Sequence, residues 1–374
     1  MSTITVRPVR TSSDREQFIE FMWTMNHASP SWVPPLRMDR RKLMDRKKNP
    51  FYQHADAEFY IAERGGEMVG RIGAIVNHNH NREHAESMGF FGFFESVNDQ
   101  TVANVLLDTA REFVRAHGAT ALRGPVTPSV NDEYGLLVDG FDKTPTALMP
   151  YNPPFYATLL EGYGLRKLKD LYAYHMEQAT VYSERLERAN ALVKQRQGLE
   201  IRQLDMKHFK EGVEKIKAVY NRAWAKNWGA VPMTDHEMDA LATDLKQVIV
   251  PELVIFAEKQ GKTIGFALSL PDINQALRFN RSGGLVTGLW HLWTKKKHID
   301  TVRIIALGTL PEFLNTGAAG VLFYETAVRA KRLGYAYGEA SWVLEDNDRM
   351  VKSAEALNGV ISKRYRLYQM PVTS

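Results

Sequence analysis

Three polar residues stand at a position where chemistry often occurs in α/β proteins. Glu345, Asp346 and Asn347 follow a predicted strand at residues 336–343 and precede a predicted helix at 348–357. Functional groups gather where such strands end and helices begin. A carboxylate there can accept a proton if burial or a like charge raises its pKa. The same residues can instead act only as the N-cap of the helix, and both interpretations stay open.

A second polar stretch, at residues 77–84, has the composition of a metal site. On a strand, His78 and His80 would face the same side and could provide two ligands. The alternative is an exposed polar turn, which we favour because no fixed carboxylate partner is evident. We therefore expect no metal.

Composition narrows the chemistry further. The chain has 374 residues and no cysteine, which excludes disulfides, thiolate zinc sites and a cysteine nucleophile. It contains no G-x-S-x-G elbow, H-E-x-x-H, P-loop or G-x-G-x-x-G motif. A net charge of +5 favours anionic partners. No dense run of Lys and Arg with interleaved aromatic residues is present, so we expect no nucleic-acid partner.

The expected location is cytoplasmic. The first residues lack the basic-then-apolar order of a signal peptide, and no segment reaches the ~20 apolar residues needed to cross a bilayer. One segment, 285–297, combines Trp290 and Trp293 with lysines at 295–297. This combination suits peripheral contact with an anionic membrane, although the tryptophans could equally cover a core or an acyl chain.

The elements that must hold these residues are organised as an internal duplication, because 374 residues predict about two domains. Three matches in the same order share an offset of 195 residues (201 − 6): Val6 with Ile201, Ala62 with Ala257, and Gly164 with Gly359. A period this long indicates a duplicated domain. Between these matches, Thr109 corresponds to Thr326, an offset of 217 (326 − 109). The second copy therefore carries about 22 extra residues before this helix (217 − 195), and the first carries a similar excess after it.

Each copy has the same predicted order of elements: strand, helices, strand pair, strand, amphipathic helix, strand, short helix and final strand. The expected ranges are 3–9 and 200–204 for the first strands, 58–63 with 68–76 and 253–258 with 263–270 for the strand pairs, 89–95 and 301–308 for the next strands, and 102–117 and 317–333 for the amphipathic helices. We expect an N-terminal domain at 1–178, a linking helix at 179–198 and a C-terminal domain at 199–374.

This order resembles a GNAT (acyl-CoA N-acyltransferase) domain, so the expected fold is α/β, with two GNAT-like domains that each contain a twisted mixed sheet flanked by helices. Almost the whole chain resembles a bacterial family of double-GNAT proteins that includes ceramide synthase-like acyltransferases. The most specific segments are 89–95, 123–133, 149–156 and 341–347. The resemblance implies transfer of an acyl group from acyl-CoA to an amine acceptor, which could be lipid-related.

The second copy carries the coenzyme A loop of the GNAT family in degraded form. Pro311, Gly317 and Ala319 match, whereas Leu314 replaces the usual Arg or Gln. In this loop, small residues let the first N–H groups of a helix bind the pyrophosphate. The residues that the resemblance places at the coenzyme are Leu307, Thr309, Leu314, Asn315, Thr316, Gly317, Ala318, Ala319, Gly320 and Asn347.

The first copy lacks this loop. Its equivalent, 94–99, has no glycine, and its Glu95 and Asp99 suit a helix start but would repel an anion. We therefore expect a single coenzyme site, in the C-terminal copy.

The catalytic candidates are Glu345 as a base, Asn347 beside the pantetheine arm, and Tyr134. Many GNAT enzymes use a tyrosine seven residues after this asparagine as the acid, but here that position is Ala354. Tyr365 and Tyr368 are close in sequence, with strand packing as their simpler role.

The excess of the first copy, 125–156, is either a long surface loop or the acceptor side of an interdomain cleft. The expected substrate-binding residues are Asn131, Asp132, Glu133, Tyr151, Asn152, Tyr156 and Trp342. Two other functions stay open: a non-catalytic or ligand-sensing double-GNAT protein, favoured by Leu314 and Ala354, and an aminoacyl transferase that uses charged tRNA.

Overall fold

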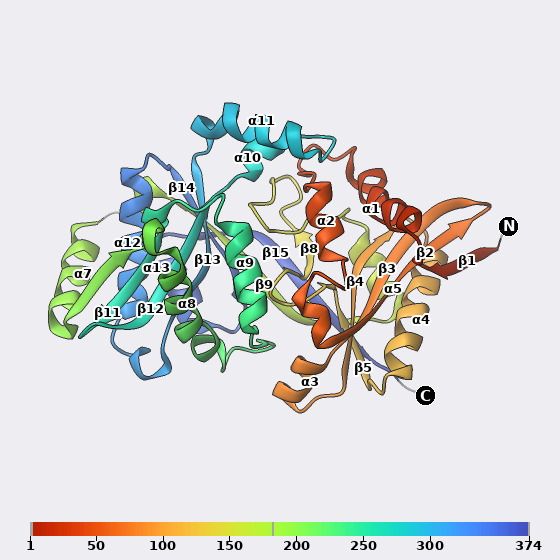
Figure 1. The fold of residues 1–374 in the computed structure, drawn as a ribbon, viewed down its shortest axis with the longest axis horizontal. Coiled ribbons are helices and arrows are strands. Elements are labelled where there is room, and N and C mark those ends of the chain that lie inside the picture. Colours follow the sequence, from red (N-terminus) through yellow and green to blue (C-terminus); the bar gives the residue numbers. More distant parts are fainter. Residues whose placement is uncertain (1–2, 182, 373–374) are drawn as a thin grey trace. The chain divides into compact units, whose positions relative to one another are not determined.

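The computed structural model describes residues 3–181 and 183–372. The chain forms two compact units, which Figure 1 shows in ribbon form. Unit 1 comprises Met1–Asp170, Leu277–Trp293 and Lys363–Ser374, and unit 2 comprises Leu171–Ala276 and Thr294–Ser362. The expected linking helix is α7 (Glu184–Gln197); its expected neighbour Tyr182 lies outside the described residues.

Unit 1 is built on a mixed sheet with helices on both faces. Its strands lie in the order β1 (Ile4–Pro8), β2 (Ala55–Arg64), β3 (Glu67–Asn77), β4 (Met88–Ser96), β5 (Ala121–Gly124) and β15 (Val360–Pro371). Only β4 and β5 among these neighbours pair in parallel. Helices α4 (Gln100–Ala116) and α5 (Tyr156–Tyr163) bury their apolar residues against one face. On the other face, Phe18 of α1 (Ser12–Asn26) packs edge-on against Phe59 and Phe93.

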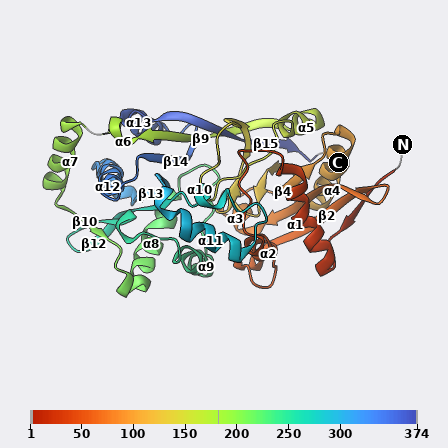
Figure 2. The same ribbon diagram turned by 90° about the horizontal axis from the view of Figure 1, so that it is seen from above.

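Unit 2 repeats this plan. Its strands lie in the order β9 (Arg166–Glu177), β14 (Tyr337–Leu344), β13 (Thr301–Thr309), β12 (Lys262–Pro271), β11 (Val254–Lys259) and β10 (Leu199–Gln203). Helices α8 (Phe209–Trp224) and α9 (Asp235–Leu245) cover one core and α12 (Ala318–Arg332) covers another. Because Phe256 belongs to the first core and its neighbours Ile255 and Ala257 to the second, these helices lie on opposite faces of the sheet (Figure 2).

The backbone geometry confirms the internal duplication. The register of β2 against β3 shifts between Ala62 and Glu63, and that of β11 against β12 shifts between Ala257 and Glu258. These irregularities are 195 residues apart (257 − 62), which is the offset seen in the sequence. Such bulges occur at defined positions and persist in related domains.

The last strands of the two copies complete each other's sheets. β9, which ends the first copy, pairs with β14 in unit 2 from Tyr337–Glu177 to Leu344–Leu171. β15, which ends the second copy, pairs with β5 in unit 1 from Tyr368–Gly124 to Pro371–Ala121. The boundaries expected at 1–178 and 199–374 did not anticipate this exchange. Strand pairing depends on main-chain hydrogen bonds, which carry little sequence information about the partner.

One further segment differs from expectation. Residues 77–84 were expected to form an exposed turn, but His78–His84 form helix α3, in which His80 is buried and its Nε2 lies 3.1 Å from Glu86 Oε2. Among the described residues, no group of three or more His, Asp or Glu could hold a metal ion. In the same part of the chain, no helix combines the length and the apolar character needed to cross a bilayer.

Candidate active site

The neighbouring parallel strands β13 and β14 of unit 2 part from one another along their length. They are paired from Thr301–Tyr337 to Ile304–Ala340. β13 then runs on to Thr309 and β14 to Leu344. At this point the register of β13 against β12 also shifts, between Leu268 and Ser269. Parted strands present main-chain N–H and C=O groups that an extended ligand can pair with.

A buried arginine links the two strands where they part. Arg303 on β13 is 2% exposed; its Nε donates to Ser341 Oγ at 3.0 Å and its Nη2 to the Ser341 carbonyl oxygen at 3.1 Å. Ser341 Oγ in turn donates to Glu339 Oε1 at 2.8 Å. The guanidinium also lies 5.2 Å from the ring centre of Trp342, one of the expected substrate-binding residues. Arg303 thus fixes the position of β14 and of Trp342.

The expected coenzyme loop lies between β13 and α12. After a short turn at Pro311–Phe313, Gly317 takes the N-cap position of α12 with a φ of +81°, and Ala318 begins the helix. A left-handed φ strains residues other than glycine. A Cβ on Gly320 would meet no atom within 4 Å, so the first turn of α12 is open. The first N–H groups of a helix have no partner within it. The Ala318 N–H donates to Thr316 Oγ1 at 3.3 Å, so the N–H groups that an anion could reach are those of Ala319 and Gly320.

The other expected coenzyme residues differ in exposure. Leu314 is 42% exposed and Leu307 is half-buried. Thr309 is buried, and its hydroxyl has no hydrogen-bond partner among the described residues. Asn315 Oδ1 accepts a bond from Arg349 Nη2 at 3.4 Å, which joins the loop to helix α13 (Asp348–Ala356). Thr316 Oγ1 donates to the Phe313 carbonyl oxygen at 2.7 Å and so shapes the turn.

The candidate base and its neighbour lie between β14 and α13. Asn347 is the N-cap of α13, and its Oδ1 accepts from the Met350 N–H at 3.3 Å. Glu345, two residues earlier, is half-buried. Ala354 is fully buried, so no polar side chain occupies the position of the usual tyrosine acid. Asn347 therefore has a structural role whether or not it also contacts a ligand.

In unit 1 the corresponding gap is filled by the chain itself. The pairing of β4 with β5 runs from Met88–Ala121 to Phe90–Arg123. Beyond it, a Cβ on Gly92 would stand 1.9 Å from the Val126 carbonyl oxygen, and Thr127 Oγ1 accepts from the Phe93 N–H at 2.9 Å. The segment after β5 thus covers this strand edge in unit 1.

The two carboxylates of the first copy have different roles. Asp99 is the N-cap of α4 and accepts from the Thr101 N–H, as a helix start requires. Glu95 was also expected to suit the helix start, but it lies on β4, is 4% exposed and is covered by α1. Tyr156 donates its hydroxyl to Glu95 Oε2 at 2.5 Å. The pairing of Arg71 with Glu95 across β3 and β4 explains the burial.

Arg71, Glu95 and Tyr156 form a buried polar cluster, which also includes Asn26. Arg71 Nη2 lies 3.4 Å from Glu95 Oε1, and its Nη1 donates to the Phe18 carbonyl oxygen at 2.6 Å. Burial raises the pKa of Glu95 although Arg71 opposes this effect, and burial lowers the pKa of Arg71. In unit 2 the position of Arg71 is Phe266 (71 + 195), which packs with Tyr220 and Trp224.

The loop residues expected to bind the acceptor fall into two groups. Tyr134, Asn152 and Tyr156 are buried in unit 1. Burial raises the pKa of Tyr134, and Asn152 bonds both main-chain groups of Leu137. The half-buried group consists of Asn131, Asp132, Glu133 and Tyr151. Asp132 accepts a hydrogen bond from Ser129 Oγ at 2.6 Å, and Glu133 forms an ion pair with Arg40. The hydroxyl of Tyr151 lies 2.6 Å from that of Ser29, within hydrogen-bonding distance. Only this second group offers polar atoms near the surface.

Sequence reasoning missed Arg71, Asn26 and Arg303. The sequence did contain a signal for Arg71. This charged residue interrupts an apolar strand, and a second charged residue, Glu95, ends the apolar run of the next strand. Buried charges are rare unless they are paired. Two such interruptions on neighbouring strands therefore predict an ion pair.

No model of a protein family matches the chain. The bacterial ceramide synthase of Caulobacter vibrioides is 35% identical over 378 residues, which cover 98% of this chain and 97% of that protein. Protein YghO of Escherichia coli is 31% identical over 376 residues, which cover 98% and 95%.

Solved structures share the fold. A tandem GNAT protein from the clavulanic acid biosynthesis pathway aligns over 100% of this chain and 99% of its own, with a TM-score of 0.59 and 12% identity. A GCN5-related N-acetyltransferase from Sphaerobacter thermophilus gives a TM-score of 0.52 at 13% identity, over 99% and 96%. From the fold and the two full-length relatives together, the chain belongs to the tandem GNAT family of N-acyltransferases that includes the bacterial ceramide synthase.

Proposed function

We propose that this protein transfers an acyl group from acyl-CoA to an amine, and that unit 2 holds the coenzyme. The observation that carries the proposal is the glycine start of α12 at Gly317, which lies directly after β13, the strand that parts from β14. A helix start attracts a pyrophosphate through its free N–H groups and its dipole. Open space at Gly320 fits this group, and the exposed Leu314 is able to move aside.

The chain would catalyse the reaction mainly by positioning. Bound acyl-CoA supplies a thioester carbonyl carbon that an amine can attack. The parted edges of β13 and β14 can pair with the extended pantetheine arm and orient it. A strand N–H near Leu307 can polarise the carbonyl oxygen. The acyl carbon forms a bond to nitrogen, its bond to sulfur breaks, and the thiolate leaves and takes up a proton.

The amine must be neutral before it can attack. Glu345 is the proposed base, either directly or through a water molecule, because it lies at the end of β14 beside the N-cap of α13. Ala354 provides no acid, so the thiolate would be protonated by solvent or by the proton that Glu345 has taken. Tyr134 is buried in unit 1 and therefore stays a weaker candidate than Glu345.

The acceptor is proposed to be a long-chain amino alcohol. The name of the C. vibrioides relative supports this class, since a ceramide is the amide of a fatty acid and such an amine. In unit 1, the half-buried Asn131, Asp132, Glu133 and Tyr151 are the candidates for contact with its polar end.

Thiol release tests the reaction directly. The protein has no cysteine, so a thiol reagent measures free coenzyme A without background from the enzyme. We expect release from a long-chain acyl-CoA to accelerate when a long-chain amino alcohol is added, and the amide to appear in equal amount by mass spectrometry. Release that is unchanged by any amine would contradict acyl transfer to nitrogen.

A non-catalytic, ligand-sensing protein is the second candidate function. Leu314 in place of Arg or Gln and the buried Ala354 favour it. A thermal-shift series with acetyl-CoA, a long-chain acyl-CoA and free coenzyme A separates the candidates when it is run beside the release assay. Stabilisation without any release would support the sensor, and stabilisation with release supports the enzyme.

A further inference from the structure

Helix α11 (Leu285–Lys295) has an apolar face that the rest of unit 1 leaves exposed. The residues on it are exposed by 44% at Leu285, 81% at Val286, 53% at Leu289, 59% at Trp290 and 76% at Trp293. Their spacing places them along one side of the helix. The two indole rings lie 5.6 Å apart between centroids. Contiguous exposed apolar surface of this kind marks a site of interaction.

The opposite side of α11 is fixed to unit 1. Gly288 is buried, and a Cβ there would stand 2.8 Å from Leu36 Cδ2. In the segment that leads into the helix, Trp23 Nε1 donates to the Arg281 carbonyl oxygen at 3.0 Å and the Arg37 N–H donates to the Gly283 carbonyl oxygen at 2.9 Å. The exposed face therefore belongs to an anchored helix.

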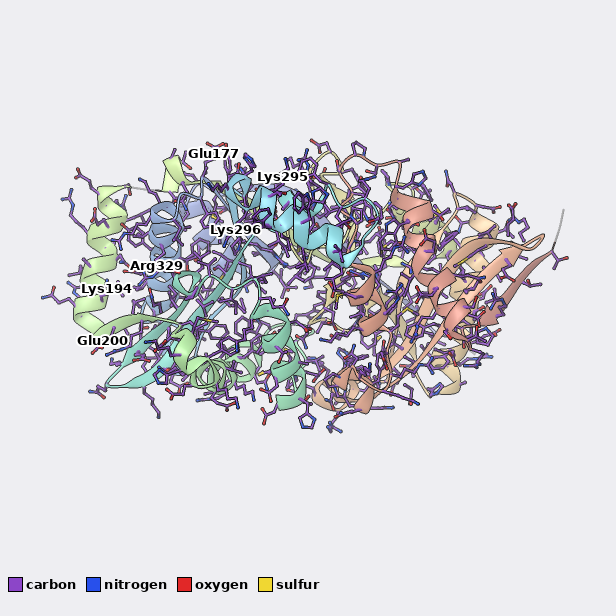
Figure 3. The ribbon with its side chains drawn as sticks, turned by 45° about the horizontal axis from the view of Figure 1, so that its top comes forward. Glu177, Lys194, Glu200, Lys295, Lys296 and Arg329 are labelled. Carbon is purple, nitrogen blue, oxygen red and sulfur yellow. The ribbon has the colours of Figure 1, made fainter. Side chains whose placement is uncertain are left out.

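A basic run follows the apolar face directly. Lys295 ends the helix, Lys296 and Lys297 come next and are exposed, and Figure 3 shows Lys295 and Lys296 at the C-terminal end of α11. Residues 285–298 contain no Asp or Glu. Apolar and cationic groups thus share one short segment.

We propose that α11 and the lysines after it dock the protein on an anionic lipid bilayer. Tryptophan rings are favoured at the depth of the lipid headgroups, and leucine and valine side chains insert at the boundary between headgroups and acyl chains. Lysines pair with the anionic headgroups. An apolar groove on a protein would explain the exposed face but not the adjoining basic run. The inference does not depend on the proposed chemistry, because docking requires no coenzyme.

Vesicle sedimentation of the full chain tests the proposal. We expect the protein to sediment with vesicles of phosphatidylcholine and phosphatidylglycerol, much less with phosphatidylcholine alone, and less as salt rises. Lys296→Gln with Lys297→Gln should weaken binding roughly 30-fold, since each basic residue contributes about 1 kcal/mol at such a surface. Trp290→Ser with Trp293→Ser should also weaken vesicle binding. The binding that this variant retains should depend on salt as strongly as that of the unaltered protein.

Matched variants control for general effects. Leu192→Ser with Val360→Ser removes apolar residues that are 45% and 61% exposed elsewhere, and Lys47→Gln with Lys48→Gln removes exposed lysines elsewhere. Both should bind vesicles as the unaltered protein does, and all four variants should unfold at similar temperatures. Equal vesicle binding by the tryptophan variant would overturn the proposal. The proposal would also be overturned if the protein bound no vesicles and light scattering showed a dimer that the two tryptophan substitutions dissociate.

Discussion

The side chain of Val193 lies 3.2 Å from the point where a Cβ on Gly317 would stand. Val193 belongs to α7, which lies between the two copies in the sequence and was expected to link them, and Gly317 caps α12. The absence of a side chain at Gly317 therefore lets α7 approach the loop proposed to bind coenzyme A. This contact makes Gly317 the residue at which packing and binding can be separated experimentally.

Gly317→Ala should weaken coenzyme binding more than it destabilises the fold. A left-handed φ costs about 1 kcal/mol for alanine. The added Cβ would also press on Val193 at 3.2 Å and shift the loop from which α12 begins. Gly334→Ala is the control, because Gly334 follows the other end of α12 with a φ of +88° and open space around a Cβ. Denaturant unfolding should show a loss of stability for both variants, somewhat larger for Gly317→Ala because its Cβ meets Val193. Calorimetry should show weaker coenzyme A binding for Gly317→Ala alone. Equal binding by the two would remove this loop from the site.

Glu345→Gln should lower kcat by about 100-fold or more, the range expected for a lost general base. Its melting temperature should stay close to that of the unaltered protein, because the change is isosteric. Asp346→Asn alters the neighbouring, exposed carboxylate and should retain activity. If both variants kept full activity in the thiol-release assay, Glu345 would have no part in proton transfer.

The buried pair of Arg71 and Glu95 should show strong energetic coupling. Glu95→Gln alone leaves the Arg71 charge buried without its counter-ion, which should cost about 3 kcal/mol of unfolding free energy. Arg71→Met with Glu95→Gln should recover most of this loss, since unit 2 has Phe266 at the position of Arg71. Urea unfolding of both single variants and the double variant measures the coupling. Losses that simply add would show that the ion pair is not coupled.

Stability should fall in acid through Asp170. Burial alone would raise the pKa of Asp170, but bonds from Arg366 and from Lys167 lower it below its usual value. The carboxylate therefore contributes stability above the unfolded pKa of about 4, and the contribution is lost as pH falls through the lower folded pKa. Asp170→Asn should lower the unfolding free energy by about 3 kcal/mol at neutral pH. It should also make the unfolding free energy fall less steeply as the pH is lowered. The exposed Asp56, which is paired with His78, provides the control. Asp56→Asn should change neither the unfolding free energy at neutral pH nor its fall in acid.

The sequence predicted the fold well where the signal was local. The amphipathic pattern placed α4 and α12 within two residues of their observed ends, and the 195-residue offset reappears in the bulges at Ala62 and Ala257. The position of Gly317 at the start of α12 followed from the apolar spacing of the helix together with the resemblance of this loop to that of the GNAT family.

Features that depend on distant partners were not predictable from local patterns. β9 and β15 read as ordinary final strands, and nothing in their residues says which sheet each one joins. The burial of Glu95 required knowledge of the register that places it opposite Arg71. Asn152 and Tyr156 resembled ligand-binding residues by type, but they pack and hydrogen-bond inside unit 1.

The proposed acyl transfer depends most on where coenzyme A binds, and amide hydrogen exchange with saturating coenzyme A measures this directly. Free N–H groups at a helix start exchange rapidly until a ligand accepts a bond from them. We predict slower exchange at residues 319–320 at the start of α12, because the Ala318 N–H already donates to Thr316 Oγ1. We predict no change at residues 100–103 at the start of α4, which serves as the internal reference. Protection at the start of α4, or at neither helix, would contradict a single coenzyme site in unit 2.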